Sequence, residues 1–327
     1  MATIRITQID GPLPNIALMK LAHWHRSRGD QVTVTRKIEP DLFEPSHYDA
    51  VYGSAIFRFS EERITRFTSQ WPGAILGGIG TGNPLTIEQV IGRDPYELYD
   101  YTGWDADYSI GFTQRGCRLK CKFCVVPTKE GKNRSINTIF NIWRGVPHPK
   151  KLHLLDNDFF GQPREQWEAR VNEIVSGGFK VCLSQGVNVR LIDDDSATAL
   201  ARMQYRNTAF NSRRLYTAWD NMGDEKVFFR GVDRLERAGI PPKHLMCYML
   251  IGFNPRETGD MIWHRFNRMV ERGIRPYPMV YDRTRKDLTA FQRWVNLGLY
   301  RFVPWDEYER RPDWLGAPAP IAAKATA

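Results

Sequence analysis

From residue 108 onward, short strand-like segments alternate with longer helical segments, and this alternation restricts the possible folds more than any other feature. Neighbouring parallel strands need crossover connections of this length, which are usually helices. Six successive strand–helix units indicate a partial (β/α) barrel, whose chemistry is expected at the carboxyl ends of the strands. The predicted strands are 108–113, 151–155, 180–184, 214–218, 244–251 and 278–281, and the predicted helices are 137–144, 164–176, 196–205, 225–238, 258–272 and 287–297.

A smaller version of the same pattern occupies the first 92 residues. Its strand-like segments and its first helix predict a small doubly wound (Rossmann-like) domain of the α/β class. The predicted strands are 4–9, 32–34, 49–52 and 74–76, and the predicted helix is 16–28. The predicted domains are 1–92, a linker at 93–107, the barrel at 108–300, and a C-terminal extension at 301–327 with a disordered Pro/Ala-rich tail.

The composition is that of a soluble globular protein, with 42% hydrophobic and 25% charged residues. No apolar run approaches the roughly 20 residues of a membrane span, and no secretory signal is recognisable. We therefore expect a cytoplasmic protein without a membrane partner. The net charge of +9 suits an anionic partner such as a nucleotide or nucleic acid, although a solvated basic surface would explain it equally well.

Three of the five cysteines, Cys117, Cys121 and Cys124, lie within eight residues of one another, directly after the first barrel strand. Such clustering is poor geometry for disulfides and indicates metal binding. Three thiolates can ligate three irons of a 4Fe–4S cluster and leave the fourth iron open for another ligand. Cys182 and Cys247 lie in apolar runs, where we expect buried thiols.

The Cys-x3-Cys-x2-Cys spacing, with Phe123 before the last cysteine, resembles the signature loop of the radical S-adenosylmethionine (SAM) superfamily. The resemblance implies that SAM chelates the open iron and that the cluster cleaves it to a 5′-deoxyadenosyl radical. It also implies a reducing partner such as flavodoxin or ferredoxin. The alternatives are a structural zinc site completed by His148 or His153, and a ferredoxin-like site, for which a fourth cysteine is missing.

Further SAM-binding candidates follow the later strands in the order that the superfamily uses. Asp156, Asn157 and Asp158 resemble a segment that contacts the SAM amino group, and carboxylates suit an ammonium group. They also suit a helix start. The remaining cofactor-binding candidates are Gln185, Asn188 and Arg190 for the SAM carboxylate or the substrate, Asp220 for the ribose, and Leu250, Ile251 and Gly252 for the adenine. The alternatives are ordinary surface-loop polarity for Gln185, Asn188 and Arg190, and an ordinary buried strand for Leu250 and Ile251.

The N-terminal domain resembles the cobalamin-binding-like domain of one radical SAM branch, including its glycine turn at residues 77–82. The Asp-x-His-x-x-Gly motif that supplies a cobalt ligand is absent, so we expect no cobalamin and a domain that shapes the substrate pocket. The domain also lacks cysteine. The methylthiotransferase branch holds a second cluster there, so the sequence argues against that activity.

The sequence therefore predicts a radical SAM enzyme that abstracts hydrogen from a substrate, with a nucleotide or nucleic acid as one substrate class. It does not identify a catalytic acid or base. A cobalamin-dependent methyltransferase and a non-catalytic, metal-stabilised nucleic-acid-binding protein are the alternatives. A basic rim for a phosphate-bearing substrate is expected at the carboxyl ends of the strands, from Arg115, Arg118, Lys120 and Lys122 in the cysteine loop and from Arg283, Arg285 and Lys286 after the last strand.

Overall fold

The computed structural model describes residues 1–83, 85–93 and 97–308, and the predicted disordered tail lies largely outside this range. The chain divides into two compact units, residues 1–107 and the residues from 108 onward. Both combine helices with parallel sheets, as expected for the α/β class. No helix within the described residues is long and apolar enough to cross a membrane.

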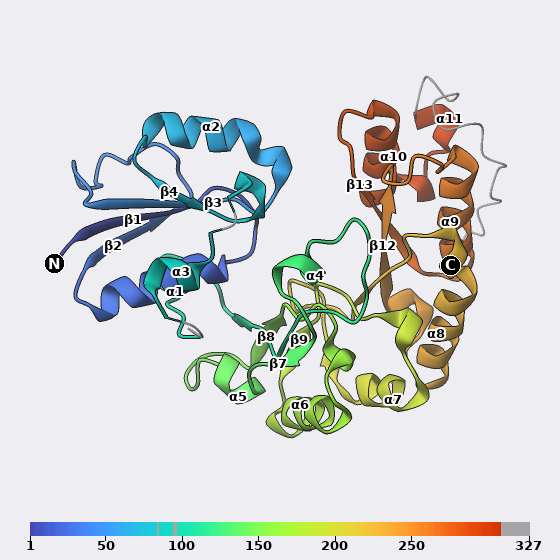
Figure 1. Cartoon of the computed structure of the whole chain (residues 1–327). Helices are drawn as coiled ribbons and strands as arrows, with labels where there is room; N and C mark the ends of the chain where they lie inside the picture. Colours follow the sequence, from blue (N-terminus) through green and yellow to red (C-terminus); the bar gives the residue numbers. More distant parts are fainter. Residues whose placement is uncertain (84, 94–96, 309–327) are drawn as a thin grey trace. The chain divides into compact units, whose positions relative to one another are not determined.

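The first unit is built on a four-stranded parallel sheet in the order β2-β1-β3-β4. Figure 1 shows α2 on one face of this sheet and α1 with α3 on the other, which is the doubly wound arrangement. Its strands are β1 (Thr3–Gln8), β2 (Gln31–Thr35), β3 (Ala50–Ser54) and β4 (Ile75–Gly77), and its α-helices are α1 (Ile16–Ser27), α2 (Glu61–Gln70) and α3 (Ile87–Ile91).

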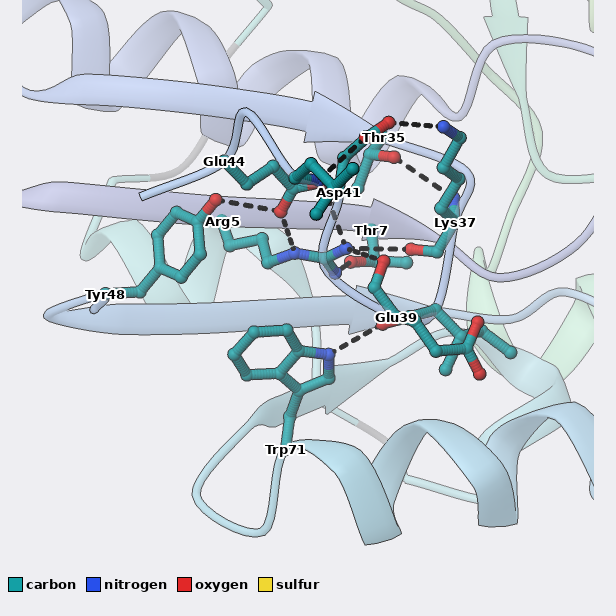
Figure 2. A network of polar contacts seen from close by, with 11 residues as sticks. Arg5, Thr7, Thr35, Lys37, Glu39, Asp41, Glu44, Tyr48 and Trp71 are labelled. Atoms are coloured by element: carbon teal, nitrogen blue, oxygen red, sulfur yellow. Dashed lines mark hydrogen bonds and ion pairs between the residues drawn. The ribbon is translucent and has the colours of Figure 1, made fainter. Parts of the chain in front are cut away.

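A buried arginine fixes the long loop between β2 and β3 (Figure 2). Arg5 points from β1 with its side chain fully buried, and its Nε donates to Glu44 Oε2 at 2.8 Å. Its Nη2 donates to the carbonyl oxygens of Lys37 at 2.9 Å and Glu39 at 3.2 Å, and its guanidinium lies 4.7 Å from the Trp71 ring centroid. A buried charge needs partners of this kind, so one cation holds the loop to the sheet.

The segment predicted as a linker packs against the first unit where it is described. Trp104 is buried, and its Nε1 donates to Gln8 Oε1 at 2.9 Å. Arg26 Nη1 donates to Asp100 Oδ2 at 2.6 Å. Residues 97–107 therefore complete the first unit.

The second unit contains the six predicted strands, all parallel, but it divides them between two sheets with the orders β10-β9-β8-β5 and β11-β12-β13. Figure 1 shows helices packed along the outside of these strands. The strands are β5 (Ser109–Gly111), β8 (Lys151–Leu154), β9 (Lys180–Cys182), β10 (Gln204–Tyr205), β11 (Leu215–Ala218), β12 (Leu245–Ile251) and β13 (Arg275–Val280). The α-helices are α4 (Val126–Lys129), α5 (Ile139–Ile142), α6 (Arg164–Gly177), α7 (Asp194–Arg202), α8 (Glu225–Arg237), α9 (Gly259–Glu271), α10 (Lys286–Asn296) and α11 (Trp305–Tyr308).

The two sheets meet between β9 and β11 without forming a continuous ladder. Val187 N donates to Tyr216 O at 2.8 Å, and the Tyr248 hydroxyl donates to Ser184 O at 2.8 Å. The short strand β10 occupies the edge of β9 instead. A single six-stranded barrel sheet is thus not formed by the described hydrogen bonds, although the strand order along the chain is the one predicted.

Two predicted helices differ from the structure. The helix predicted at 137–144 shrinks to α5, because Trp143 leaves the helical conformation and its ring packs against Phe179. The helix predicted at 196–205 begins earlier and ends at Arg202, because β10 pairs with β9. Tertiary contacts override helix propensity in both cases.

Candidate functional site

The three-cysteine loop follows β5, at the carboxyl end of its sheet. Cys117, Cys121 and Cys124 are free thiols and partly exposed. A two-stranded antiparallel ladder, β6 (Gln114–Arg115) with β7 (Arg134–Ser135), closes the base of the loop and was not predicted from the sequence. Cys182 and Cys247 are fully buried, which confirms the prediction for them.

An ion pair ties the cysteine loop to the end of β8. Arg118 Nε donates to Asp158 Oδ2 at 2.8 Å and its Nη2 donates to Oδ1 at 3.0 Å. The Arg118 backbone N–H donates to the same carboxylate at 3.2 Å. Asp158 has only 1% of its side chain exposed. Both of its oxygens accept hydrogen bonds from the loop, and the SAM contact predicted for this residue stays a prediction.

Asp156 holds the start of the loop in the same way. Its Oδ1 accepts from the backbone N–H of Thr113 at 2.7 Å and of Gln114 at 3.2 Å, and its Oδ2 accepts from the Thr113 hydroxyl. Burial raises the pKa of Asp156 to about 7, and the nearby charge of Glu130 adds to this, although the three donors favour the carboxylate form. Asp156 thus anchors the loop that carries the cysteines.

Glu130 joins the far side of the loop to the same strand end. Its Oε2 accepts from the Gly116 backbone N–H at 3.0 Å and from Asn157 Nδ2 at 2.8 Å. Its Oε1 lies 3.2 Å from Arg115 Nη2. All three residues of the predicted Asp156–Asp158 segment therefore contact the cysteine loop or its flanks.

A cation from the β9 side lies beside one cysteine. Arg190, in the short 3-10 helix Val189–Leu191, donates from Nη1 to Asp224 Oδ2 at 2.6 Å. Its Nη2 lies 4.0 Å from Cys121 Sγ. The role predicted for Arg190, contact with the SAM carboxylate or the substrate, stays a prediction, and its side chain lies against the cysteine loop. A cation suits an anionic thiolate at this position.

The ends of β11 and β12 are joined by a buried polar network. Asp220 Oδ1 accepts from the Leu250 N–H at 2.9 Å, and burial raises the pKa of Asp220. Arg265 has a fully buried side chain, donates to Leu250 O at 3.2 Å and pairs with Glu257. Glu257 Oε2 also accepts from the Gly252 N–H at 2.7 Å, and Gly252 has φ +78°, a conformation that favours glycine. Leu250 and Gly252 thus have their N–H groups occupied.

Aromatic rings connect the cysteine loop with the β12 and β13 ends. The Phe123 ring lies 5.5 Å from that of Phe253, edge to face. Phe253 in turn lies 4.9 Å from Tyr281, which is 52% exposed. The structure therefore places Phe123 beside the fifth strand end.

The remaining predicted residues divide into accessible and inaccessible positions. Gln185 is exposed, whereas Ile251 is fully buried in the core and offers no side chain to a ligand. Asn188 has a buried Nδ2 without a hydrogen-bond partner among the described residues. A buried orphan donor of this kind is costly unless a bound group accepts from it.

The cysteine loop offers three free thiols, the donor type that 4Fe–4S clusters use. In the described part of the chain, no three His, Cys, Asp or Glu side chains converge enough to hold a single metal ion. Ligands of a 4Fe–4S cluster bind different irons, so they need not converge on one point. Leu119 N lies 3.4 Å from Cys117 Sγ, and N–H groups near cluster sulfurs are typical supporting contacts. Burial raises the pKa of Cys117 and Cys124, so the binding of iron would have to displace thiol protons.

Neither histidine considered for a zinc site adjoins the cysteines by any described contact. His153 is fully buried on β8, and its ring packs against Tyr108 and Phe210. Burial lowers the pKa of His153 to about 4. His148 is exposed, and its carbonyl oxygen accepts from the Trp143 indole.

Three arginines of the expected basic rim, Arg115, Arg118 and Arg285, pair with acids. Arg118 pairs with Asp158 and Arg115 with Glu130, as described above. Arg285 pairs with Asp287 at 2.5 Å. Lys120, Lys122, Arg283 and Lys286 are exposed. Arginines of the loop thus serve mainly to fix its position.

The glycine turn of the first unit packs against the unit's own backbone. A Cβ on Gly78 would lie 2.2 Å from Ala55 O, and one on Gly80 would lie 2.5 Å from Phe57 O. These glycines permit close packing of the turn, which explains their presence without a bound cofactor.

Sequence reasoning missed Glu130, Asp224 and Arg265, which hold the site together through contacts with residues distant in the sequence. No local motif marks them. Their partners come from other strand ends, so only the assembled fold identifies them.

No family model matches the chain. The chain is similar to the tRNA-2-methylthio-N(6)-dimethylallyladenosine synthase of Sulfurihydrogenibium sp. (strain YO3AOP1), with 26% identity over 161 residues. The aligned stretch covers 44% of this chain and 36% of that protein. The chain thus spans about a third of this relative's length.

Proposed function

We propose that this chain is a radical SAM enzyme. The observation that carries the proposal is a loop with three free thiols, Cys117, Cys121 and Cys124, that four strand ends hold in place. A 4Fe–4S cluster bound there would supply one electron, taken from a flavodoxin- or ferredoxin-like donor, to split SAM into methionine and a 5′-deoxyadenosyl radical. The chemistry supplied would be the removal of one hydrogen atom from a substrate, with 5′-deoxyadenosine as the product.

The chain's own residues have distinct proposed roles around this chemistry. Asp156 and Asp158 position the loop, and Arg190 offsets the negative charge at Cys121. Asn188 and Gln185 remain available to a ligand, since the Asn188 Nδ2 has no described partner and Gln185 is exposed. We assign them to SAM or substrate binding.

The substrate class proposed is a nucleic acid, RNA in particular. Two facts support it: the similarity to a synthase named for a modified adenosine of tRNA, which is a member of the radical SAM methylthiotransferase branch, and the net charge of +9. Methylthio transfer itself is not proposed, because that branch uses a second cysteine-ligated cluster. The only other cysteines of this chain, Cys182 and Cys247, are fully buried.

Iron and sulfide analysis after anaerobic reconstitution tests the proposal. Wild type should hold about four irons and four sulfides per chain, and Cys121→Ala should lose most of them. Cys182→Ala is the matched control, since it removes a buried thiol outside the loop and should keep the cluster. A single zinc per chain, or iron retained by Cys121→Ala, would contradict the assignment.

A further inference from the structure

Cations stand at the amino ends of the strands in the second unit, opposite the cysteine loop. Lys151, Lys180 and Arg275 are the first residues of β8, β9 and β13. Arg214 directly precedes β11, and Lys243 lies two residues before β12. Because the strands of a parallel sheet begin at one edge, the cations of each sheet share that edge. Because β12 has seven residues, its amino end lies about 20 Å from its carboxyl end.

The cations at the β11-β12-β13 edge contact neutral groups. Arg214 Nη1 donates to Lys243 O at 3.3 Å, and Arg275 Nη2 donates to Asn296 O at 3.2 Å. Within the described ranges, neither arginine forms an ion pair with Asp or Glu. Their register explains the proximity, since Leu215 pairs with Leu245 and Arg275 pairs with the next residue of β12.

Two more arginines at this edge lie over aromatic rings. Arg213 is 5.6 Å from the Tyr205 ring centroid, and Arg301 is 5.5 Å from that of Tyr300. Both arginines are exposed, and the described part of the chain provides neither with an acidic partner. The neighbouring Phe302 is 83% exposed. We call Arg213, Arg214, Lys243, Arg275 and Arg301 the basic edge.

The charges of the basic edge repel one another. Burial lowers the pKa of Arg214, and the charges of Arg275 and Arg301 lower it further. Burial likewise lowers the pKa of His244, with added effects from Arg213, Lys243 and Arg214. The strand register and the contact of Arg214 with Lys243 bring Arg214, Lys243 and Arg275 together, and a bound anion would relieve their repulsion.

We infer that the basic edge binds the phosphate backbone of single-stranded RNA, with the exposed Phe302 as a stacking surface for a base. Guanidinium groups match phosphate oxygens with paired hydrogen bonds, and four of the five cations are arginines. An exposed aromatic ring such as Phe302 beside a basic surface is typical of single-strand binding. A small anion would not require the exposed ring of Phe302.

This binding surface is separate from the cysteine loop, so the two proposals can fail independently. Substitutions at the basic edge lie at the other end of the strands and should leave RNA-independent SAM cleavage unchanged. Formation of 5′-deoxyadenosine without RNA thus tests the proposed chemistry, while RNA binding tests the basic edge.

The experiment measures the binding of the reconstituted full chain to a labelled single-stranded RNA of about 20 nucleotides between about 50 and 200 mM salt. The variant combines Arg213→Gln with Arg301→Gln, both at exposed positions. The matched control combines Lys226→Gln with Arg230→Gln, which removes the same charge from exposed positions of α8.

Wild type should bind with a steep salt dependence. The basic-edge variant should bind at least about tenfold more weakly at low salt, with a log–log slope shallower by about 1.4, because each phosphate contact on a single strand contributes about 0.7. The control variant should keep the wild-type slope. Undetectable RNA binding at about 50 mM salt, or equal weakening of RNA binding in both variants, would overturn the inference. Displacement of the RNA by millimolar inorganic phosphate would also overturn it. The same holds if the basic edge binds flavodoxin and no RNA.

Discussion

The cations at the two ends of the strands in the second unit have different kinds of partners. At the carboxyl end, two arginines of the cysteine loop have acidic partners, Arg118 with Asp158 and Arg115 with Glu130. At the amino end, the arginines contact carbonyls and rings, as Arg214 and Arg213 do. Ion pairs at one end fix a loop in place, whereas unpaired charge at the other remains available to an outside anion. The number of arginines in the sequence does not distinguish these uses.

Folding stability should depend strongly on pH, because Asp156 is buried at the carboxyl end of the strands. The pKa of Asp156 is about 7 in the folded chain, against its ordinary value of 3.8, so the unfolded chain loses this proton first as the pH rises. Folding stability should therefore fall between about pH 4 and pH 7, by at most about 4 kcal/mol. Urea unfolding across this range measures it, and Asp156→Asn should flatten this part of the profile. A profile that the substitution leaves unchanged would show that the donors from Thr113 and Gln114 keep the carboxylate ionised.

Removing the ion pair at the same end should destabilise the loop. Asp158→Asn leaves Arg118 without its buried partner, and we expect a loss of about 2–3 kcal/mol in unfolding free energy together with weaker iron retention. Arg118 is 39% exposed, so water compensates part of the loss. Asp194→Asn, at an exposed ion pair on α7, is the control and should change stability by less than about 1 kcal/mol. Equal effects would mean that the buried pair does not anchor the loop.

Helix α8 packs closely against the segment that carries Arg190, and adding a single methyl group at Gly231 should disturb this packing. A Cβ on Gly231 of α8 would lie 2.0 Å from the carbonyl oxygen of Val189, next to Arg190. Gly231→Ala should therefore cost about 2 kcal/mol in thermal or urea unfolding. Gly223→Ala, where the added carbon meets nothing within 4 Å, is the matched control. If both substitutions cost the same, the contact with Val189 is not what restricts the position.

The smallest effect is expected at the amino end. Combining Arg213→Gln with Arg301→Gln should change the unfolding free energy by less than about 0.5 kcal/mol, because both side chains are exposed and have no acidic partner in the described structure. A destabilisation of about 2 kcal/mol would show that these cations stabilise the fold, and the contrast between the two ends would then disappear.

The sequence predicted most strands and helices of the second unit, but it did not predict which strands pair with one another. Alternating segments predicted parallel strands such as β12, and apolar surroundings predicted the burial of Cys182 and Cys247. The division into two sheets depends on the two-residue strand β10, which carries too few residues for a periodicity to show. Periodicity reports burial along one segment and contains no information about which strand edges meet.

The sequence predicted which residues lie near the site, and it did not predict the contacts that each of them makes. In the structure, Asp158 and Arg190 contact the cysteine loop, and Phe123 of this loop lies beside Phe253. The partners described for them come from segments 34 to 130 residues away, such as Phe253 for Phe123. Whether a carboxylate serves a ligand or another part of the chain is decided by those partners, which local sequence cannot show.

Product analysis tests the central claim most directly. Reconstituted protein, reduced with dithionite and given SAM, should release 5′-deoxyadenosine and methionine in equal amounts, and Cys121→Ala should release neither above background. Equal amounts are expected because one electron splits one SAM molecule into these two fragments. A wild-type protein that holds its full iron complement and yet forms no 5′-deoxyadenosine would contradict the assignment of this chain as a radical SAM enzyme.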